Sequence, residues 1–234
     1  MKSKYVFKIT SNMNDINENL KPEAILDLFQ TAAKDNANSL GLGQDYLRPK
    51  GYSFVLLRVK FEIVGSLNKL EEVVVETWPN VKERVEFKRQ FNIQDELGNI
   101  LVEGSSIWAI IDVNARRICR SDGFDFNAPS QNQEYYFSSL DKANISNLTY
   151  DDQFNYQINF DDIDLLGHLN NSKYLKLLLM YEKKMPKWVQ IDYLKEVKEN
   201  ANLTIRHSQI DGKHILVGSD FSNTNFVISY ERTE

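Results

Sequence analysis

The sequence predicts an α+β protein in which one structural unit occurs twice, each copy a long helix wrapped by a curved antiparallel sheet. Three observations lead to this prediction: a helical apolar pattern near the start of each half, strand-like alternation after each helix, and a stretch without periodicity between them. Of the 234 residues, 42% are apolar and 26% are charged, which is the balance of a folded chain rather than a disordered one.

The first half begins with a strand pattern over residues 5–10. Apolar residues then recur at helical spacing over 22–40, where Pro22 suits a first helical turn and Gly41 suits a helix end. After this helix the apolar period becomes two, which predicts a half-buried strand over 55–63 with the odd-numbered residues facing the core. Further strand patterns cover 70–78, 84–94 and 100–111.

The second half repeats this order of elements. Residues 121–152 have no periodicity and are rich in Ser, Asn, Gln and Asp, as expected of a linker. A curved antiparallel sheet must cover its concave face, and one long helix in each half can do so. The arrangement is the hotdog fold, with expected repeats at 1–125 and 153–234, a linker at 126–152, and an internal pseudo-dimer. The elements expected in the second half are a strand at 153–159, a helix at 169–182, and strands at 188–197, 202–209, 214–220 and 225–231.

Composition and charge exclude several classes of protein. No apolar run reaches the ~18 residues that span a bilayer, and the N-terminus lacks the apolar segment of a secretory signal, so we expect a cytoplasmic protein without membrane insertion. The single cysteine, Cys119, excludes an internal disulfide and a multi-cysteine zinc site. A net charge of −5 lacks the basic excess of a nucleic-acid binder, so no nucleic-acid partner is expected.

No motif in the sequence predicts a metal or a cofactor. Residues 162–173 begin like a calcium-binding loop, but Leu166 cannot be a ligand and Lys173 stands where that loop needs glutamate. The pair Gly41 and Gly43 follows a helix, which is the wrong context for a dinucleotide-binding loop. We therefore expect no cofactor and no metal.

Residues 162–174 read Asp-Ile-Asp-Leu-Leu-Gly-His-Leu-Asn-Asn-Ser-Lys-Tyr. This segment resembles the active-site pattern of the acyl-acyl-carrier-protein (acyl-ACP) thioesterases of plants and bacteria, Asp-x-Asp-x-Asn-x-His-Val-Asn-Asn-x-x-Tyr. Residues 192–197, Asp-Tyr-Leu-Lys-Glu-Val, are similar to the Glu-Tyr-x-x-Glu-Cys strand of the same family. The resemblance extends in family order over about residues 5–200. Its first-half parts are Thr77-Trp78, Arg89, Ser106-Ile-Trp108 and Asp112-Val-Asn-Ala-Arg-Arg117.

Two positions depart from the family pattern. Leu166 stands where the family has a catalytic asparagine, and leucine can neither donate nor accept a hydrogen bond. Val197 stands where plant members have cysteine. The second change matters less if catalysis runs through water and a carboxylate.

The resemblance implies hydrolysis of fatty acyl-ACP to release a free fatty acid, without a covalent nucleophile. Glu196 would act as general base toward water. His168 would orient or help to activate that water, and Asp164 would hold the imidazole or contact the substrate. Backbone N–H groups at the helix entrance, around Leu169, Asn170 and Asn171, would suit the developing oxyanion.

Each of these residues also has a plain structural interpretation. Acidic residues before a helix are commonly caps, and this applies to Asp162 and Asp164. Asn170 and Asn171 are equally suited to capping, and Glu196 lies among charged neighbours as a solvated side chain would.

The acyl chain and the carrier protein give two further expectations. The first repeat lacks Asp-x-x-x-His at its own helix entrance, so it is the copy expected to hold the acyl chain. The candidate acyl-binding residues, all equally suited to a core, are Leu28, Phe29, Ala32, Val55, Leu57 and Trp108.

Acyl carrier proteins are acidic, so a basic docking patch is expected. The candidates are Arg116, Arg117 and Arg120, then Lys82, Arg84 and Lys88; the alternative is a solvated turn whose arginines pair with Asp112 and Asp122.

Other functions compatible with the fold are an acyl-CoA thioesterase, a hotdog hydratase, and a non-catalytic acyl-binding protein. The Leu166 substitution keeps the non-catalytic function open. The expected assembly is a monomer with an internal pseudo-dimer, or a homodimer.

Overall fold

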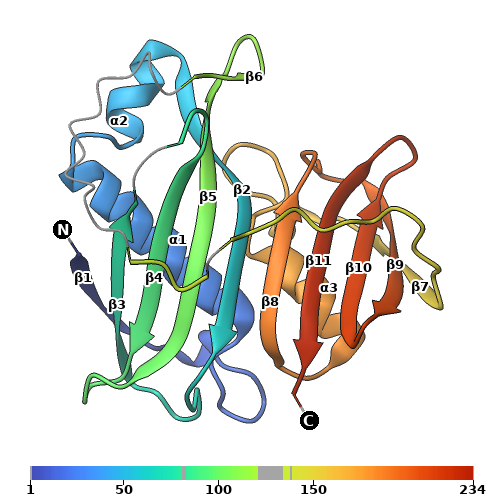
Figure 1. Ribbon diagram of the computed structural model, residues 1–234, viewed down its shortest axis with the longest axis horizontal. Helices are drawn as coiled ribbons and strands as arrows, with labels where there is room; N and C mark the ends of the chain where they lie inside the picture. The colour runs from blue at the N-terminus through green and yellow to red at the C-terminus, as the bar shows by residue number, and fades with distance from the viewer. Residues whose placement is uncertain (1, 81–82, 121–133, 138, 234) are drawn as a thin grey trace. The chain divides into compact units, whose positions relative to one another are not determined.

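The computed structural model describes residues 2–80, 83–120, 134–137 and 139–233, and it divides into two compact units, Met1–Leu140 and Asp141–Glu234. In each unit one long helix packs against an antiparallel sheet (Figure 1), which confirms the tandem hotdog fold. No helix in these ranges is long and apolar enough to cross a membrane.

The first unit is built around helix α1, Pro22–Ser39, which begins and ends close to the predicted positions. Its sheet has the strand order β1-β3-β4-β5-β2 with antiparallel neighbours, and β6 pairs with the end of β5. The strands are β1 Ser3–Lys8, β2 Tyr52–Ile63, β3 Glu72–Pro79, β4 Phe87–Gln94, β5 Ile100–Asp112 and β6 Arg117–Ile118. Short helical turns, which the sequence analysis missed, are η1 Ser11–Met13, α2 Gln44–Leu47 and η2 Arg48–Lys50.

Phe29 on α1 is the centre of the first core. Its ring stacks on Phe91 of β4 with the centroids 4.5 Å apart, and it meets the ring of Phe61 of β2 edge-on at 6.2 Å. Gly104 of β5 lies against the same ring, because a Cβ atom there would lie 2.4 Å from Phe29 Cε2. The absence of a side chain at Gly104 therefore lets the helix approach the sheet.

Strand β2 differs from the predicted alternation. Its register against β5 shifts between Leu56 and Arg58, so Leu57 is an extra, bulged residue. Leu56 is consequently buried, whereas Val55 and Leu57 are only half-buried. The prediction that the odd-numbered residues face the core was wrong at Val55 and Leu57. A bulge exchanges the core-facing and solvent-facing positions of the strand residues that precede it.

The second unit holds helix α3, Lys173–Glu182, against a sheet of order β8-β11-β10-β9-β7. The strands are β7 Asp152–Gln157, β8 Pro186–Tyr193, β9 Asn202–Ile210, β10 Lys213–Ser219 and β11 Thr224–Arg232, and the turn η4 covers Phe160–Asp162. Tyr174 of α3 packs edge-on against Phe226 of β11 at 4.9 Å. The helix begins at Lys173 rather than at 169, because the preceding residues form the loop described below.

The segment expected to be a linker contributes to both cores where it is described. The Tyr136 ring lies 5.6 Å from that of Trp78. In the second unit three apolar residues of the segment, Ala143, Ile145 and Leu148, pack against Ile215, Val217 and Val227. Residues 126–133 and 138 lie outside the described residues. A polar composition therefore does not keep this segment away from the sheets.

Candidate active site

A five-residue turn before α3 positions His168. The Asp164 backbone N–H donates to the His168 carbonyl at 2.8 Å, and the Gly167 N–H donates to the Asp164 carbonyl at 3.0 Å. Gly167 has φ +79°, a left-handed conformation that glycine adopts without strain. Asp164 Oδ1 accepts hydrogen bonds from the backbone N–H groups of Leu166 (2.8 Å) and His168 (3.2 Å). The carboxylate thus closes the turn that carries the histidine.

The same turn occurs before α1. There Asp15 Oδ1 accepts from the backbone N–H groups of Asn17 (2.8 Å) and Asn19 (2.9 Å), and Glu18 takes the left-handed conformation with φ 62°. Asp15 thus makes the contacts of Asp164 in a turn that has no histidine.

A third copy of the turn joins β4 to β5. Asp95 Oδ1 accepts from the N–H groups of Leu97 (3.0 Å) and Asn99 (2.8 Å), and Gly98 has φ 86°. The contacts of Asp164 are therefore those of a turn-forming residue, and they reach His168 through its backbone rather than its imidazole.

Glu196 lies beside the imidazole of His168. Its Oε2 is 3.1 Å from His168 Nε2, and the two side chains are 49% and 24% exposed, so the pair is open to solvent. Glu196 was expected on a strand but lies in the loop after β8. Two backbone contacts hold the loops together: a bridge between His168 and Lys198, and a hydrogen bond of 2.8 Å from the Leu169 N–H to the Val197 carbonyl.

The first unit has the same backbone frame without these side chains. Asn19 bridges to Asn68 as His168 does to Lys198, and the Leu20 N–H donates to the Leu67 carbonyl at 3.0 Å. When the two units are matched by these backbone contacts, Asn19 stands at the position of His168 and Ser66 at the position of Glu196. The duplicated frame therefore carries an imidazole and a carboxylate in the second unit alone.

Two of the expected oxyanion donors are already engaged. The Leu169 N–H is bonded to Val197, and the Asn170 N–H donates to the Asp162 carbonyl at 2.9 Å. Both residues precede the helix rather than starting it, so the prediction of available N–H groups was wrong for them. Asn170 Oδ1 accepts from the Ser172 N–H at 3.1 Å, which closes a turn just before the helix rather than capping it. The Asn171 carbonyl accepts from the Tyr193 hydroxyl at 2.9 Å.

Asp162 connects the loop before α3 to the neighbouring strand and helix. It is buried, and its Oδ1 lies 2.9 Å from Lys176 Nζ while its Oδ2 accepts from the Tyr156 hydroxyl at 2.8 Å. Burial alone would raise the pKa of Asp162, but the hydrogen bonds from Lys176 and Tyr156 outweigh it, so this pKa lies below its ordinary value. The loop is therefore tied by one buried ion to both β7 and α3.

Tyr174, in the first turn of α3, lies close enough to Asp164 and Glu196 for their charges to act on it. It is buried, and its ring meets that of Tyr193 edge-on at 5.1 Å. Burial first, and then the carboxylates of Asp164 and Glu196, raise the pKa of Tyr174 above its ordinary value. This hydroxyl consequently stays protonated and does not serve as a base.

Leu166 faces solvent. Its side chain is 58% exposed, and that of the neighbouring Leu165 is fully exposed. The position at which the family pattern has asparagine is therefore not a core position in this chain.

The six expected acyl-binding residues lie in the first unit. Leu28, Phe29 and Ala32 are fully buried in its core, whereas Val55, Leu57 and Trp108 are half-buried. The Trp108 indole N–H donates to Ser106 Oγ at 2.7 Å.

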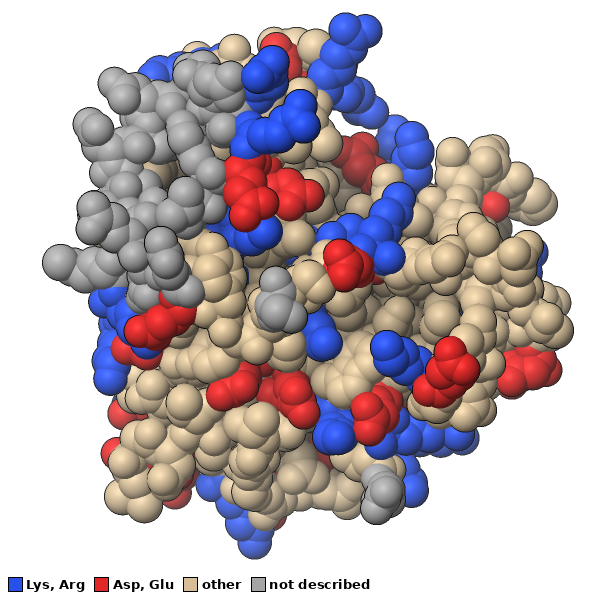
Figure 2. Space-filling model, in the orientation of Figure 1, with Lys and Arg blue, Asp and Glu red and all other residues tan. Residues whose placement is uncertain are grey.

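The expected docking arginines surround β6 and are exposed. Arg116 lies in the turn after β5 with φ 51°, and Arg117 pairs in register with Asp112. Asp112 Oδ1 accepts from the N–H groups of Asn114 and Ala115, so this carboxylate closes the turn. Arg120 follows β6. Figure 2 shows lysine and arginine side chains over the end of the first unit that carries β6, with acidic side chains among them.

The remaining basic candidates are placed less favourably for docking a carrier protein. Lys88 forms an ion pair with Glu83 at 2.9 Å, and Arg84 is exposed in the preceding turn. Lys82 and Asp122 lie outside the described residues.

Two family models match this chain in order. The acyl-ACP thioesterase N-terminal domain matches residues 1–122, and the acyl-ACP thioesterase C-terminal domain matches residues 145–232. None of the curated protein sequences matches significantly.

Three solved structures share the fold over nearly the whole chain. An acyl-ACP thioesterase from Bacteroides thetaiotaomicron is 19% identical with a TM-score of 0.86, covering 98% of this chain and 97% of that one. A putative oleoyl thioesterase from Lactobacillus plantarum is 20% identical with a TM-score of 0.84, covering 100% and 98%. A 12:0-ACP thioesterase from Umbellularia californica is 18% identical with a TM-score of 0.76, covering 98% and 96%.

Proposed function

The chain belongs to the acyl-ACP thioesterase family, and on that basis we propose that it hydrolyses fatty acyl-ACP and releases a free fatty acid. One observation carries the proposal beyond family membership. His168 and Glu196 occupy the histidine and glutamate positions of the family pattern, and their side chains, which come from two adjoining loops, lie 3.1 Å apart and open to solvent.

The proposed reaction needs no covalent nucleophile. Glu196 takes a proton from a water molecule whose oxygen attacks the thioester carbonyl carbon, while His168 holds the water and the carboxylate in place. The tetrahedral intermediate then collapses, the C–S bond breaks, and the proton passes from Glu196 to the departing sulfur. The products are a fatty acid and the carrier thiol.

Asp164 has a positioning role in this proposal. Its carboxylate shapes the turn through the backbone of His168 and so places the imidazole beside Glu196. With Leu166 in place of the asparagine, activation of water depends on the imidazole and the carboxylate alone.

The substrate side of the proposal assigns the exposed arginines around β6 to the acidic carrier. Arg116, Arg117 and Arg120 gather on one short segment, which supports an electrostatic landing site. The first repeat is proposed to hold the acyl chain, and Val55, Leu57 and Trp108 are the better candidates because Leu28, Phe29 and Ala32 already pack in the core.

The decisive experiment measures free-thiol release from acyl-ACP and acyl-CoA of the same chain length. We expect turnover of acyl-ACP by the native chain. In Glu196→Gln the amide keeps the shape and loses the base, so kcat should fall by roughly 100-fold or more with the fold retained. A His168→Ala variant should behave similarly.

Three results would contradict the proposal. Near-native kcat in Glu196→Gln would return Glu196 to a solvated-charge role. Absence of turnover on both substrates would favour the non-catalytic acyl-binding alternative, and a clear preference for acyl-CoA would favour the thioesterase of that class. Glu199→Gln, an exposed neighbour on the same loop, is the matched control and should leave kcat unchanged.

A further inference from the structure

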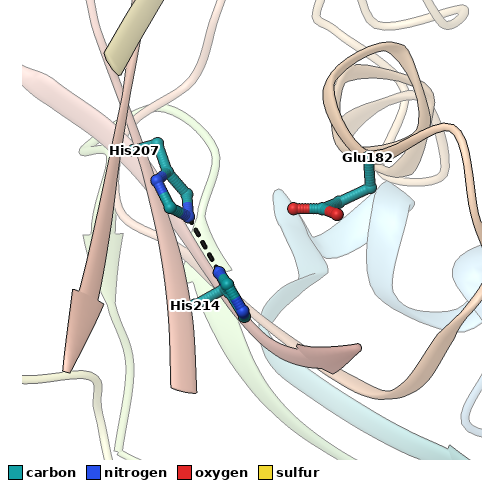
Figure 3. Close-up of side chains that lie close together, drawn as sticks. All are labelled: Glu182, His207 and His214. Atoms are coloured by element: carbon teal, nitrogen blue, oxygen red, sulfur yellow. Dashed lines mark hydrogen bonds between the residues drawn. The ribbon is translucent and has the colours of Figure 1, made fainter. Parts of the chain in front are cut away.

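Two of the three histidines in the chain lie together in the second unit, away from the His168 turn. His207 on β9 and His214 on β10 are both 4% exposed, and Glu182 is the last residue of α3 (Figure 3). His207 Nε2 and His214 Nδ1 are 3.0 Å apart. One possible ligand atom from each of the three residues lies within 4.8 Å of the others.

The surrounding residues orient these ligand atoms. His207 Nδ1 is 2.6 Å from Asp151 Oδ1, and because a carboxylate only accepts, this nitrogen carries a proton, which in the neutral ring leaves Nε2 with its lone pair for a metal. A histidine held by a carboxylate on its other nitrogen is the usual arrangement around a bound metal. The rings are also fixed by stacking, Tyr181 on His207 at 4.9 Å and Tyr230 on His214 at 5.2 Å.

The carboxylate of Glu182 forms an ion pair with Arg232, whose side chain is exposed. Arg232 Nε lies 2.7 Å from Glu182 Oε2 and its Nη2 lies 2.9 Å from Oε1, while the Tyr230 hydroxyl also donates to Oε1. A metal ion bound to Oε1 would therefore replace both the Tyr230 hydroxyl and Arg232 Nη2, while Oε2 stays with Arg232 Nε. Arg232 neutralises the carboxylate in this structure and competes with a metal for it.

The spacing of His207 Nε2 and His214 Nδ1 suits a small transition-metal ion. In a tetrahedral zinc site with Zn–N bonds of 2.0–2.1 Å, two ligand nitrogens lie about 3.4 Å apart. The gap between His207 and His214 needs to widen by only a few tenths of an ångström. Two imidazoles and one carboxylate are a ligand set that zinc accepts, whereas magnesium and calcium prefer oxygen ligands.

We propose that Glu182, His207 and His214 form a binding site for a divalent transition-metal ion of the zinc type, with Asp151 positioning His207. This inference does not depend on the proposed thioesterase activity. Such a site would tie the end of α3 to β9 and β10. No metal was expected from the sequence, and the ligands at 182, 207 and 214 match no spacing motif that would have indicated one.

The test is titration of the full chain with Zn²⁺ by calorimetry, in a Cys119→Ser background that removes a competing thiol. We expect one Zn²⁺ per chain, no comparable binding of Mg²⁺, and a higher melting temperature with Zn²⁺. His207→Gln and His214→Gln should each raise the Kd by roughly tenfold or more, and Asp151→Asn by about 10- to 100-fold. His168→Gln removes the third histidine and should leave the Kd unchanged.

Arg232 provides an independent readout. Arg232→Gln frees Glu182 and should lower the Kd or leave it unchanged, whereas Glu182→Gln should raise it. Circular dichroism establishes which variants fold. If a histidine or Asp151 variant does not fold, the comparison of Arg232→Gln with Glu182→Gln takes its place. The proposal is overturned if the native chain binds no Zn²⁺, if His168→Gln loses binding as much as His207→Gln does, or if Glu182→Gln binds as tightly as the native chain.

Discussion

At the scale of single residues, Asp164 shows how a residue of the family pattern acts in this chain. Its Oδ1 accepts two backbone N–H groups, as Asp15 and Asp95 do in turns that carry no histidine. Asparagine has the same acceptor atom, so Asp164→Asn should keep the turn and most of the turnover. Asp164→Ala removes the acceptor and displaces His168, and its kcat should fall on the order of 100-fold.

The matched control is Asp95→Ala, which breaks the same turn in the β4–β5 hairpin. It should lower the free energy of unfolding without changing kcat. Equal loss of kcat in Asp164→Asn and Asp164→Ala would show that the charge itself takes part in catalysis. Steady-state thiol release and urea unfolding measure the two effects.

Leu166 gives a second prediction at this scale. Because its side chain is largely exposed, Leu166→Asn should change the free energy of unfolding by no more than about 0.5 kcal/mol. The amide would restore the polar group of the family pattern, so activity should not fall by more than severalfold. A loss of about 2–5 kcal/mol in urea unfolding would instead identify Leu166 as a core residue.

At the scale of elements, the buried ion pair of Asp162 with Lys176 connects the candidate active-site loop to α3. The pKa of Asp162 is lowered, so its contribution to stability is present above the unfolded value of about 3.9 and is lost as the pH falls through the lower folded value. For Lys176, burial lowers the pKa, but hydrogen bonds with Tyr156 and Asp162 raise it overall. The lysine contribution is therefore complete below about pH 10 and is lost as the pH rises through the raised value.

The corresponding variant is Asp162→Asn. At pH 7 it should lower the free energy of unfolding by about 1–3 kcal/mol, because a buried hydrogen-bonded charge is removed. The difference from the native chain should shrink below about pH 4, where the carboxylate of the unfolded chain takes up a proton, and it should be lost as the pH falls through the lower folded pKa. Urea unfolding at several pH values tests this. A difference that does not change with pH would mean that packing, not charge, anchors the loop.

At the scale of the whole molecule, recognition of an acidic carrier is a property of the surface charge. The chain has a net charge of −5, so approach of an acidic protein requires a local basic region to offset the overall repulsion. Replacing Arg117 and Arg120 with glutamate should raise the KM for acyl-ACP, more strongly at low salt, because exposed charges are screened over ~10 Å at ordinary ionic strength. Turnover of a small acyl thioester should hardly change.

The control for this prediction is the same change of net charge elsewhere, for example Lys34→Glu with Lys213→Glu, both exposed and outside the segment around β6. It should raise the KM for acyl-ACP much less. If the arginine variant loses activity equally on both substrates, the arginines have a structural function.

The sequence by itself was sufficient for the order of the two long helices and the main strands, though not for β6 or the short helical turns, and it placed a histidine and a glutamate in one site. Helix α1 was predicted nearly to its ends, because apolar spacing, Pro22 and Gly41 act within a few residues of chain. His168 and Glu196 lie 28 positions apart in the sequence, and the family resemblance brought them together before the structure did. The internal repeat of the Asp turn, at Asp15 and Asp164, was also present in the sequence as a signal that the analysis did not use.

The tertiary structure alone decided which polar groups are already occupied and which distant side chains meet. The N–H groups of Leu169 and Asn170 are bonded to the carbonyls of Val197 and Asp162, so they cannot serve an oxyanion. The bulge at Leu57 depends on the register against β5, and the meeting of Glu182, His207 and His214 depends on how α3 packs across β9 and β10. The physical reason is the same in each case: periodicity and turn chemistry are local, whereas hydrogen-bond partners and strand register depend on residues far away in the chain.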